Sequence, residues 1–239
     1  MLLFDGATMT GWDDPRLKSP PGDAWTIEDG CLKAKAGPRI TEDLFTRDTF
    51  HDFELVFDWR ISPRGNSGVK YRIQSHWFVA PKDPGAGRET FEQSVERSFV
   101  HPVTARPDRG QDYVIGFEYQ LTDDAMNSDA KGNLKHTAGA LYDMVAPAAH
   151  PSRPVGEFNQ SRILVLGNHV EHWMNGVKIV DSALDSPAAL EGINTRWKAA
   201  PHVAELLATQ PKRNCPISLQ NHGDEAWFRN IKIRRLGPA

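Results

Sequence analysis

The sequence predicts an all-β protein, a two-sheet antiparallel β-sandwich of about 12 or more strands. Two observations lead to this prediction. Segments in which apolar and polar residues alternate recur along the chain, and such alternation is typical of strands that bury one face. Tight-turn signals separate these segments with almost no helical pattern between them, so consecutive strands are expected to pair antiparallel.

The clearest strand is "DFELVFDWRIS", residues 52–62. Its apolar side chains fall on one face, while Glu54, Asp58 and Arg60 fall on the other. The remaining strands are expected in "SGVKYRIQ", "GFEYQLTDD", "SRILVLGNHVEHWMNGVKIVD", "CPISLQNHG" and "WFRNIKIRRL". Gly167-Asn168 and Asn175-Gly176 predict two-residue hairpin turns, because these residue types tolerate a positive φ.

Three regions interrupt the strand pattern and predict long loops on one rim of the sandwich. Residues 76–112 include "RETFEQSVERSF", whose apolar spacing suits a short helix between Pro-rich flanks. Residues 124–137 are polar and contain glycine, and residues 184–212 predict a helix that ends before Pro211. Ordered loops on a rigid scaffold commonly carry functional sites. The chain is expected to be one domain over residues 1–239.

Composition excludes several classes of function. The chain has 239 residues, of which 39% are hydrophobic and 25% charged, with a net charge of −3 and a pI near 6.3. No basic block or stripe is present, so nucleic acid is not expected as a partner. No apolar run approaches ~18 residues, so no membrane span is expected. Cys31 and Cys215 have no metal-ligand spacing; two unpaired core thiols are favoured over a disulfide.

The start of the chain, "MLLFDG", lacks a basic region and an apolar signal segment. The protein is therefore expected to be cytoplasmic if the chain is complete, or periplasmic or secreted if a signal peptide was removed. Both alternatives stay open at this point.

Polar residues within the strands raise the question of a binding face. Glu118 and Gln120 stand in an otherwise apolar and aromatic strand, and Gln220 and His222 share one side of another. On a concave sheet these groups favour a sugar-binding site, because carbohydrate sites use amides and carboxylates for hydroxyls. For Glu54, Lys70 and Arg72 we expect a wet outer surface instead.

Carbohydrate sites also use planar rings that stack on sugar C–H faces. Trp77 and Trp197 lie in irregular regions and are candidates for such contacts. The other tryptophans considered are expected in the core: Trp12, Trp25, Trp59 and Trp227.

Seven segments, in order along nearly the whole chain, together resemble the 3-keto-disaccharide hydrolase domain family. They are "LLFDGATMTGW", "WTIEDGCL", "DFELVFDWRISPRGNSGVKYRI", "GFEYQLTDD", "GALYDMVAP", "GEFNQSRILVLGNHVEHWMNGVKIVD" and "ISLQNHGDEAWFRNIKIRRL". The resemblance implies a jelly-roll sandwich of the concanavalin A-like type. It also implies hydrolysis of a glycosidic bond in a sugar oxidised to a ketone at C3.

Such a ketone acidifies the C2 proton, so the C1 oxygen can leave by β-elimination and water can then add to the enone. The route needs a general base, an acid for the leaving oxygen and an electrophile at the C3 oxygen. No cofactor is certain, although a divalent metal ion could supply the electrophile. The substrate also implies a functional link to a sugar 3-oxidoreductase.

The resemblance assigns roles to residues of the matched segments. Glu118 is the first candidate for general base or metal ligand, and His222 is the second acid, base or ligand candidate. Gln120 and Gln220 are expected to bind hydroxyls. The remaining candidates are Asp58 and Arg60 as a polar cluster with Arg60 on the enolate, Asn66, Ser67 and Tyr142 as substrate contacts, and His136 as a weaker catalytic group. A buried ion pair between the sheets is the alternative for Asp58 and Arg60.

One departure from related glucanases bears on mechanism. Retaining glucanases of this fold carry Glu-x-Asp-x-x-Glu on one strand, with two carboxylates ~5–5.5 Å apart. Here the register reads Glu118, Gln120 and Asp123. Double displacement is therefore disfavoured, whereas elimination is not. The alternatives that remain are a carbohydrate-binding module without chemistry and a conventional glycoside hydrolase.

Overall fold

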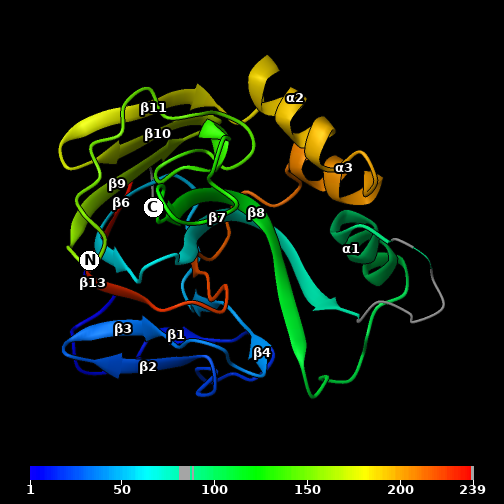
Figure 1. Ribbon diagram of the computed structural model, residues 1–239, viewed down its shortest axis with the longest axis horizontal. Helices are drawn as coiled ribbons and strands as arrows, with labels where there is room; N and C mark the ends of the chain where they lie inside the picture. The colour runs from blue at the N-terminus through cyan, green and yellow to red at the C-terminus, as the bar shows by residue number, and fades with distance from the viewer. Residues whose placement is uncertain (81–86, 88, 238–239) are drawn as a thin grey trace.

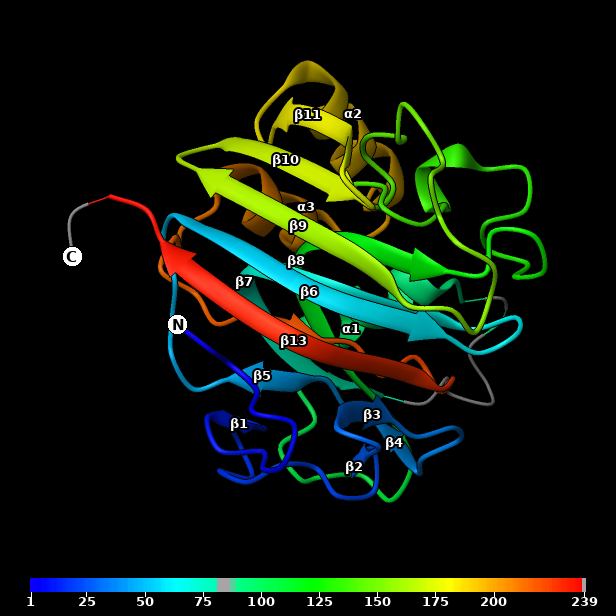
Figure 2. The ribbon, with the colours of Figure 1, turned by 90° about the vertical axis from the view of Figure 1, so that its left-hand side faces the viewer.

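The computed structural model describes residues 1–80, 87 and 89–237, and within them it confirms the predicted all-β sandwich. One sheet contains, in spatial order, β1 (Trp12–Asp13), β5 (Leu44–Thr46), β12 (Ser218–Leu219), β7 (Asn66–Val79), β8 (Gly110–Thr122) and β4 (Ile40–Thr41). The other contains β11 (Val177–Ala183), β10 (His169–Met174), β9 (Asn159–Leu166), β6 (Phe53–Ile61), β13 (Ala226–Arg235), β3 (Cys31–Ala34) and β2 (Trp25–Glu28). Pairing is antiparallel except between β4 and β8. Figure 2 shows the second sheet in front, with β7 and β8 behind it.

The main core lies between the two sheets. Alternate residues of β6 are buried, as their pattern predicts, and face alternate residues of β7 and β8. The ring of Phe57 meets Tyr119 edge-on at 5.8 Å, and the ring of Phe53 meets Tyr71 at 6.3 Å. Because side chains alternate along a strand, Glu118 and Gln120 point to the opposite face of their sheet, away from the second sheet.

Lys70 and Arg72 are not on a wet surface as predicted. Only 3% of Lys70 and 1% of Arg72 is exposed. Arg72 has a φ of 51° within a bulge of β7, and its guanidinium donates to the carbonyl oxygens of Arg213 and Gly167. The prediction failed for Lys70 because the outward face of this sheet is itself covered. It failed for Arg72 because the guanidinium, leaving β7 at the bulge, reaches Asp52 and Gly167, which adjoin strands of the second sheet. Glu54 does lie on an outer face, where Arg162 and Arg234 pair with it.

Three α-helices lie beyond β7 and β8, on the side away from β6 and β9 (Figure 1): α1 (Phe91–Val100), α2 (Pro187–Arg196) and α3 (Pro201–Thr209). Thr90 caps α1 by accepting a hydrogen bond from the Gln93 amide. The structure has two helices where one was predicted within residues 184–212: α2 ends at Arg196, and Pro201 takes the first position of α3. β7 and β8 also extend into the region 76–112 that was predicted to be irregular, of which residues 81–86 and 88 lie outside the described residues.

Several smaller predictions can be compared with the structure. Both two-residue turns form as predicted, between β9 and β10 and between β10 and β11. Cys31 and Cys215 are free and buried. Trp12, Trp25 and Trp59 are core residues, whereas Trp227 lies half-buried on the outer sheet face beneath Lys33 and Arg60. Among the described residues, no helix is both long and apolar enough to cross a membrane.

Candidate active site

A pocket of about 440 Å³ lies on the face of β7 and β8 that points away from the second sheet. The strands supply its floor, while loops and the ends of two helices supply its walls. Its lining residues are Asn66, Phe91, Gln111, Tyr113, Glu118, Gln120, Asn127, Ser128, Asp129, Tyr142, Arg196, Gln220, His222 and Asp224. The volume lies within the range of about 300–1,000 Å³ typical of small-molecule sites.

Glu118 lies in the floor of this pocket, in the middle of β8. On β7, Gly68 pairs with Gln120 and Lys70 pairs with Glu118. The carboxylate of Glu118 leans over Gly68: a Cβ atom there would lie 2.7 Å from Cδ of Glu118. The absence of a side chain at Gly68 therefore makes room for the carboxylate.

The environment of Glu118 favours its protonated form. Burial raises the pKa of this carboxyl to about 7, although the nearby ammonium of Lys70 lowers it. The side chain nevertheless remains partly accessible through the pocket. A carboxyl group with such a pKa can give or take a proton near neutral pH.

Side-chain amides line the pocket together with Glu118, among them those of Asn66, Gln120 and Gln220. The amide nitrogen of Gln120 lies 3.3 Å from Oδ1 of Asn66; turned over, it donates to the Ser67 carbonyl oxygen at 3.0 Å and to Glu118 at 3.2 Å. Oε1 of Gln220 is buried and has no hydrogen-bond partner among the described residues. Because a buried polar atom without a partner is costly, this oxygen is suited to a ligand donor.

His222 lies at the mouth of the pocket, on the loop that follows β12. The neighbouring Asn221 anchors this loop by donating to the carbonyl oxygens of Ala24 and Lys35. Gly223, with a φ of 95°, lets the chain turn there. His222 has an exposed edge, yet the protein around its ring and the positive charge of Lys70 lower its pKa below 6.5. The imidazole is therefore mainly neutral at pH 7.

A chain of hydrogen bonds supports another part of the pocket wall. Tyr142 donates to Asp129 at 2.9 Å, and His136 bridges Asp129 at 3.0 Å and Asp143 at 2.6 Å. Arg196 of α2 completes the chain by donating to Asp143 at 2.5 Å. Three of these residues, Tyr142, Asp129 and Arg196, line the pocket.

His136 is charged in this arrangement. Burial opposes the charge, but the hydrogen bonds to Asp129 and Asp143 raise the pKa of His136 to about 9. The pKa values of both carboxyls are lowered despite burial, chiefly because His136 donates to them. The ring of His136 also stacks on Tyr142 at 4.4 Å. His136 thus acts as a charged brace behind the pocket wall.

The structure brings six of the predicted site residues into the pocket lining and leaves five outside it. Those in the lining are Asn66, Glu118, Gln120, Tyr142, Gln220 and His222. Those outside it are Asp58, Arg60, Ser67, His136 and Trp197.

Asp58 and Arg60 are on the wrong side of the molecule for the predicted polar cluster. Both belong to the outer face of β6, because the alternate residues face the core. Asp58 accepts a hydrogen bond from Asn230 at 2.7 Å, and Arg60 lies over the ring of Trp227 at 4.3 Å. The alternative reading of a buried ion pair between the sheets is wrong for the same reason.

The other three residues outside the lining support the pocket from behind: His136, described above, Ser67 and Trp197. Ser67 faces the core side of β7, where its hydroxyl donates to the Gln220 carbonyl oxygen at 2.8 Å. Trp197 is buried and packs edge-on against Tyr113 at 5.9 Å. Trp77, the other expected stacking residue, is also buried and packs on Phe99. The aromatic rings that line the pocket are instead those of Phe91, Tyr113 and Tyr142.

Sequence reasoning missed the other residues of the pocket lining. Two of them, Gln111 and Tyr113, come from the first part of β8. Loops and helices contribute the others: Phe91, Asn127, Ser128, Asp129, Arg196 and Asp224. A signal was available for Asp224, which directly follows the segment that carries His222 and accepts a hydrogen bond from the Asn66 amide at 3.0 Å. Arg196 lies at the end of a helix and carries no comparable signal.

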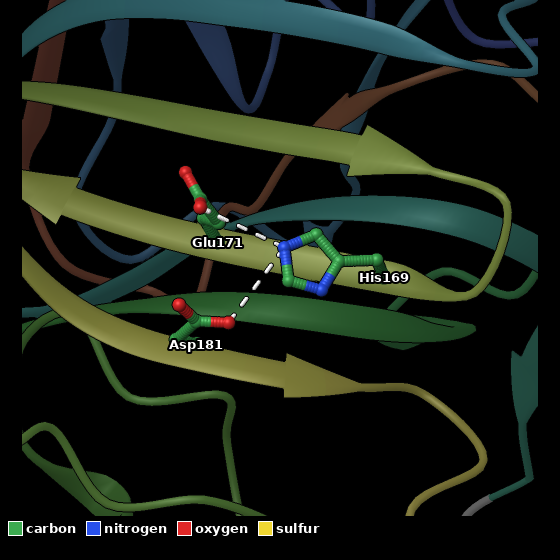
Figure 3. A group of neighbouring side chains, drawn as sticks. All are labelled: His169, Glu171 and Asp181. Atoms are coloured by element: carbon green, nitrogen blue, oxygen red, sulfur yellow. Dashed lines mark ion pairs between the residues drawn. The ribbon is translucent and has the colours of Figure 1, made fainter.

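Among the described residues, Glu118 and His222 do not belong to a group of three His, Cys, Asp or Glu side chains whose ligand atoms lie within 4.8 Å of one another. A group of suitable ligand types among the described residues is His169, Glu171 and Asp181, on the outer edge of the second sheet (Figure 3). Lys178 already pairs with both of its carboxylates. We therefore assign this outer group to surface ion pairing.

Comparisons with known proteins agree with this architecture. A curated relative from Bacteroides thetaiotaomicron, named 3-keto-disaccharide hydrolase, is 32% identical over 99% of this chain and 78% of its own length. A crystal structure from Parabacteroides distasonis, provisionally named a glycosyl hydrolase, superposes with a TM-score of 0.70 at 26% identity, covering 99% of this chain and 94% of that one. A second protein from the same organism gives a TM-score of 0.62 at 23% identity, covering 99% and 98%. Residues 1–234 match the 3-keto-alpha-glucoside-1,2-lyase-like domain, and the chain belongs to that family.

Proposed function

We propose that this protein cleaves the glycosidic bond of glycosides or disaccharides that carry a ketone at C3, by β-elimination across C1 and C2 followed by hydration. The family's description as a 1,2-lyase-like domain and the name of the Bacteroides relative support this substrate class. The observation that carries the proposal is that Glu118 and His222 line one pocket with pKa values displaced in opposite directions, upward and downward.

The chemistry proceeds in two stages. A base removes the C2 proton, and the electrons pass into the C3 carbonyl to form an enolate. The enolate then forms the C1–C2 double bond while the C1–O bond breaks, and an acid protonates the departing oxygen. Water finally adds its oxygen to C1 and a proton to C2, so the net change is hydrolysis.

The opposite pKa displacements favour an assignment of roles. His222 is mainly neutral at pH 7 and can accept the C2 proton, whereas protonated Glu118 can donate to the departing oxygen. In an α-glucoside the C2–H and C1–O bonds point to opposite ring faces, so base and acid must lie on opposite sides of the sugar. A floor carboxyl and an imidazole at the mouth suit that requirement.

Hydrogen-bond donors can stabilise the negative charge on the enolate oxygen. The pocket offers the guanidinium of Arg196 and the amides of Asn66, Gln120 and Gln220. Donors already fixed in a site of this kind stabilise developing charge without reorganisation. Arg60 is excluded from this role by its place on the outer face of β6.

Gln120 argues against the double displacement of conventional retaining enzymes. It occupies the strand position of their central carboxylate, and Asp123, at the next carboxylate position, caps backbone amides of a turn rather than lining the pocket. A retaining mechanism needs two carboxylates ~5–5.5 Å apart. Elimination does not.

The test is incubation with 3-keto-trehalose, 3-keto-sucrose and 3-keto-glucosides, with the unoxidised sugars in parallel and mass spectrometry of the products. Cleavage of the 3-keto forms alone, in D₂O with deuterium at C2 of the released sugar, supports elimination. Cleavage of unoxidised sugars would instead identify a conventional hydrolase. Binding without cleavage of either set would identify a lectin-like module. The substrate chemistry further requires a separate oxidoreductase that oxidises C3.

A further inference from the structure

Lys70 and Asp43 form a buried pair beneath the pocket floor. Their side chains are each 3% exposed, and Nζ of Lys70 lies 3.6 Å from Oδ2 of Asp43. Ser218 pairs with Lys70 between β12 and β7. Its hydroxyl donates a hydrogen bond to Oδ2 of Asp43 at 3.0 Å. The ammonium also lies 5.2 Å from the ring centre of Tyr113. Its position is therefore fixed by contacts on several sides.

Stability alone gives little reason for this pair. Replacing a buried ion pair by apolar residues of similar volume is often neutral or stabilising, since taking both charges out of water is costly. The pair occupies a particular place, however. Lys70 is the direct cross-strand neighbour of Glu118, and both side chains leave the sheet on the pocket side.

We propose that Lys70 is a positioning residue of the reaction, whose ammonium, fixed by Asp43, supplies the positive potential beneath Glu118 and His222. Lys70 does not line the pocket, so it acts through these two groups rather than on the substrate directly. As a role in catalysis, this inference rests on the proposed function.

The charged groups around the two residues define what a test must separate. Glu118 is acted on by Lys70, Asp43, Arg196 and Asp129, and His222 by Lys70, Asp224 and Asp129. Of these charges, Lys70 is the one that lowers the pKa of both Glu118 and His222. Removing it should therefore move both titrations to higher pH, whichever group is the acid.

The first experiment needs no substrate. Carbon-13 NMR of the glutamate carboxyls, with the Glu118 signal assigned by Glu118→Gln, gives the titration midpoint of Glu118. In Lys70→Met we expect it to rise by about one pH unit or more, because an opposite charge at this range typically lowers a carboxyl pKa by that amount. Asp43→Asn should lower the titration midpoint of Glu118, and Lys70→Arg should leave that midpoint near the wild-type value. Lys33→Met, which removes a charge from the outer sheet face, should have no effect.

A folded Lys70→Met variant with an unchanged midpoint would overturn the inference. If that variant does not fold, Asp43→Asn decides: a lower midpoint supports the inference and an unchanged one overturns it. The second experiment is the pH profile of kcat/KM on a 3-keto-glycoside, where both limbs should move to higher pH in Lys70→Met. A lower rate with unmoved limbs would reduce Lys70 to a structural role. Failure of the wild type to cleave any 3-keto-glycoside would count against the proposed function and leave the titration result standing.

Discussion

Gly68 leaves the space that the carboxylate of Glu118 occupies. A Cβ atom at position 68 would overlap Oε1 of Glu118 and lie 2.7 Å from Cδ and 2.8 Å from Cγ. The conformation of Gly68 is not one that only glycine adopts, so the steric relationship to Glu118 is the specific reason for glycine here.

Gly68→Ala should therefore displace the Glu118 carboxylate without disturbing the fold. We expect turnover of a 3-keto-glycoside to fall by ~100-fold, because a misplaced proton-transfer group loses most of its contribution. Steady-state kinetics with circular dichroism measures both effects. Gly22→Ala is the matched control, since nothing lies within 4 Å of its added Cβ. Wild-type turnover in Gly68→Ala would show that the carboxylate position does not matter.

Glu118→Gln should lower turnover by ~100-fold or more, because it removes the proton-transfer group but keeps its shape. The melting temperature should hold or rise, since the change also removes a charge that burial disfavours. Glu171→Gln on the outer sheet face is the matched control and should keep full activity. An active Glu118→Gln variant would transfer its assigned role to another group.

The sequence pattern predicted the strands well, but it could not decide which sheet carries the site. "FDWRI" in β6 and "FEYQL" in β8 alternate alike, with charged or amide residues between apolar ones. In β8 the polar face forms a pocket under loops and helices, whereas in β6 it faces outward. Lys70 was misread for the same reason: alternation gives the side of a strand but not what covers that side. Asp129 and Arg196 come from a loop and a helix end, whose places in space no periodicity encodes.

Because the polar face of β6 is an outer surface, its substitutions should be silent in catalysis. Asp58→Asn and Arg60→Met should each keep kcat/KM on a 3-keto-glycoside within about twofold of wild type, as surface changes away from a site usually do. Parallel kinetics of both variants checks this. A loss of tenfold or more in either would reinstate the predicted polar cluster.

The charged brace formed by His136 should make stability fall at alkaline pH. Its folded pKa of about 9 exceeds the unfolded value of about 6.5, so its contribution is complete below pH 6.5 and is lost as pH rises through 9. The full contribution is at most about 3 kcal/mol. Urea unfolding at pH 6.5 and 9 should show this loss in the wild type and little of it in His136→Gln. Equal losses in both proteins would mean that His136 is not charged in the folded state.

His172 should have the opposite effect, at acidic pH. It is fully buried; its Nδ1 donates to the Gly139 carbonyl oxygen at 2.9 Å, and its Nε2 accepts from the Tyr71 hydroxyl at 2.8 Å. Burial lowers the pKa of His172 to about 4, so the unfolded chain binds a proton first as pH falls below 6.5. Stability should therefore decline from pH 6.5 to 4, by up to about 3 kcal/mol from this residue.

His76, whose pKa burial also lowers to about 4, titrates in the same range, so the wild-type slope alone is ambiguous. The difference between wild type and His172→Gln isolates His172. The variant should be less stable at pH 7, because it loses buried hydrogen bonds, yet its stability should fall less steeply towards pH 4.

His172 also connects the core to the pocket wall. Its partner Gly139 begins the segment that carries Tyr142, and the backbone amide of Gly139 donates to the Gln120 carbonyl oxygen at 2.8 Å. Acid should therefore loosen the pocket wall before global unfolding. Protection from hydrogen exchange at residues 139–142, corrected for the intrinsic exchange rate at each pH, should therefore be lower at pH 4.5 than at pH 7. Unaltered protection there, with identical pH slopes in the two proteins, would remove His172 as the link between the core and the site.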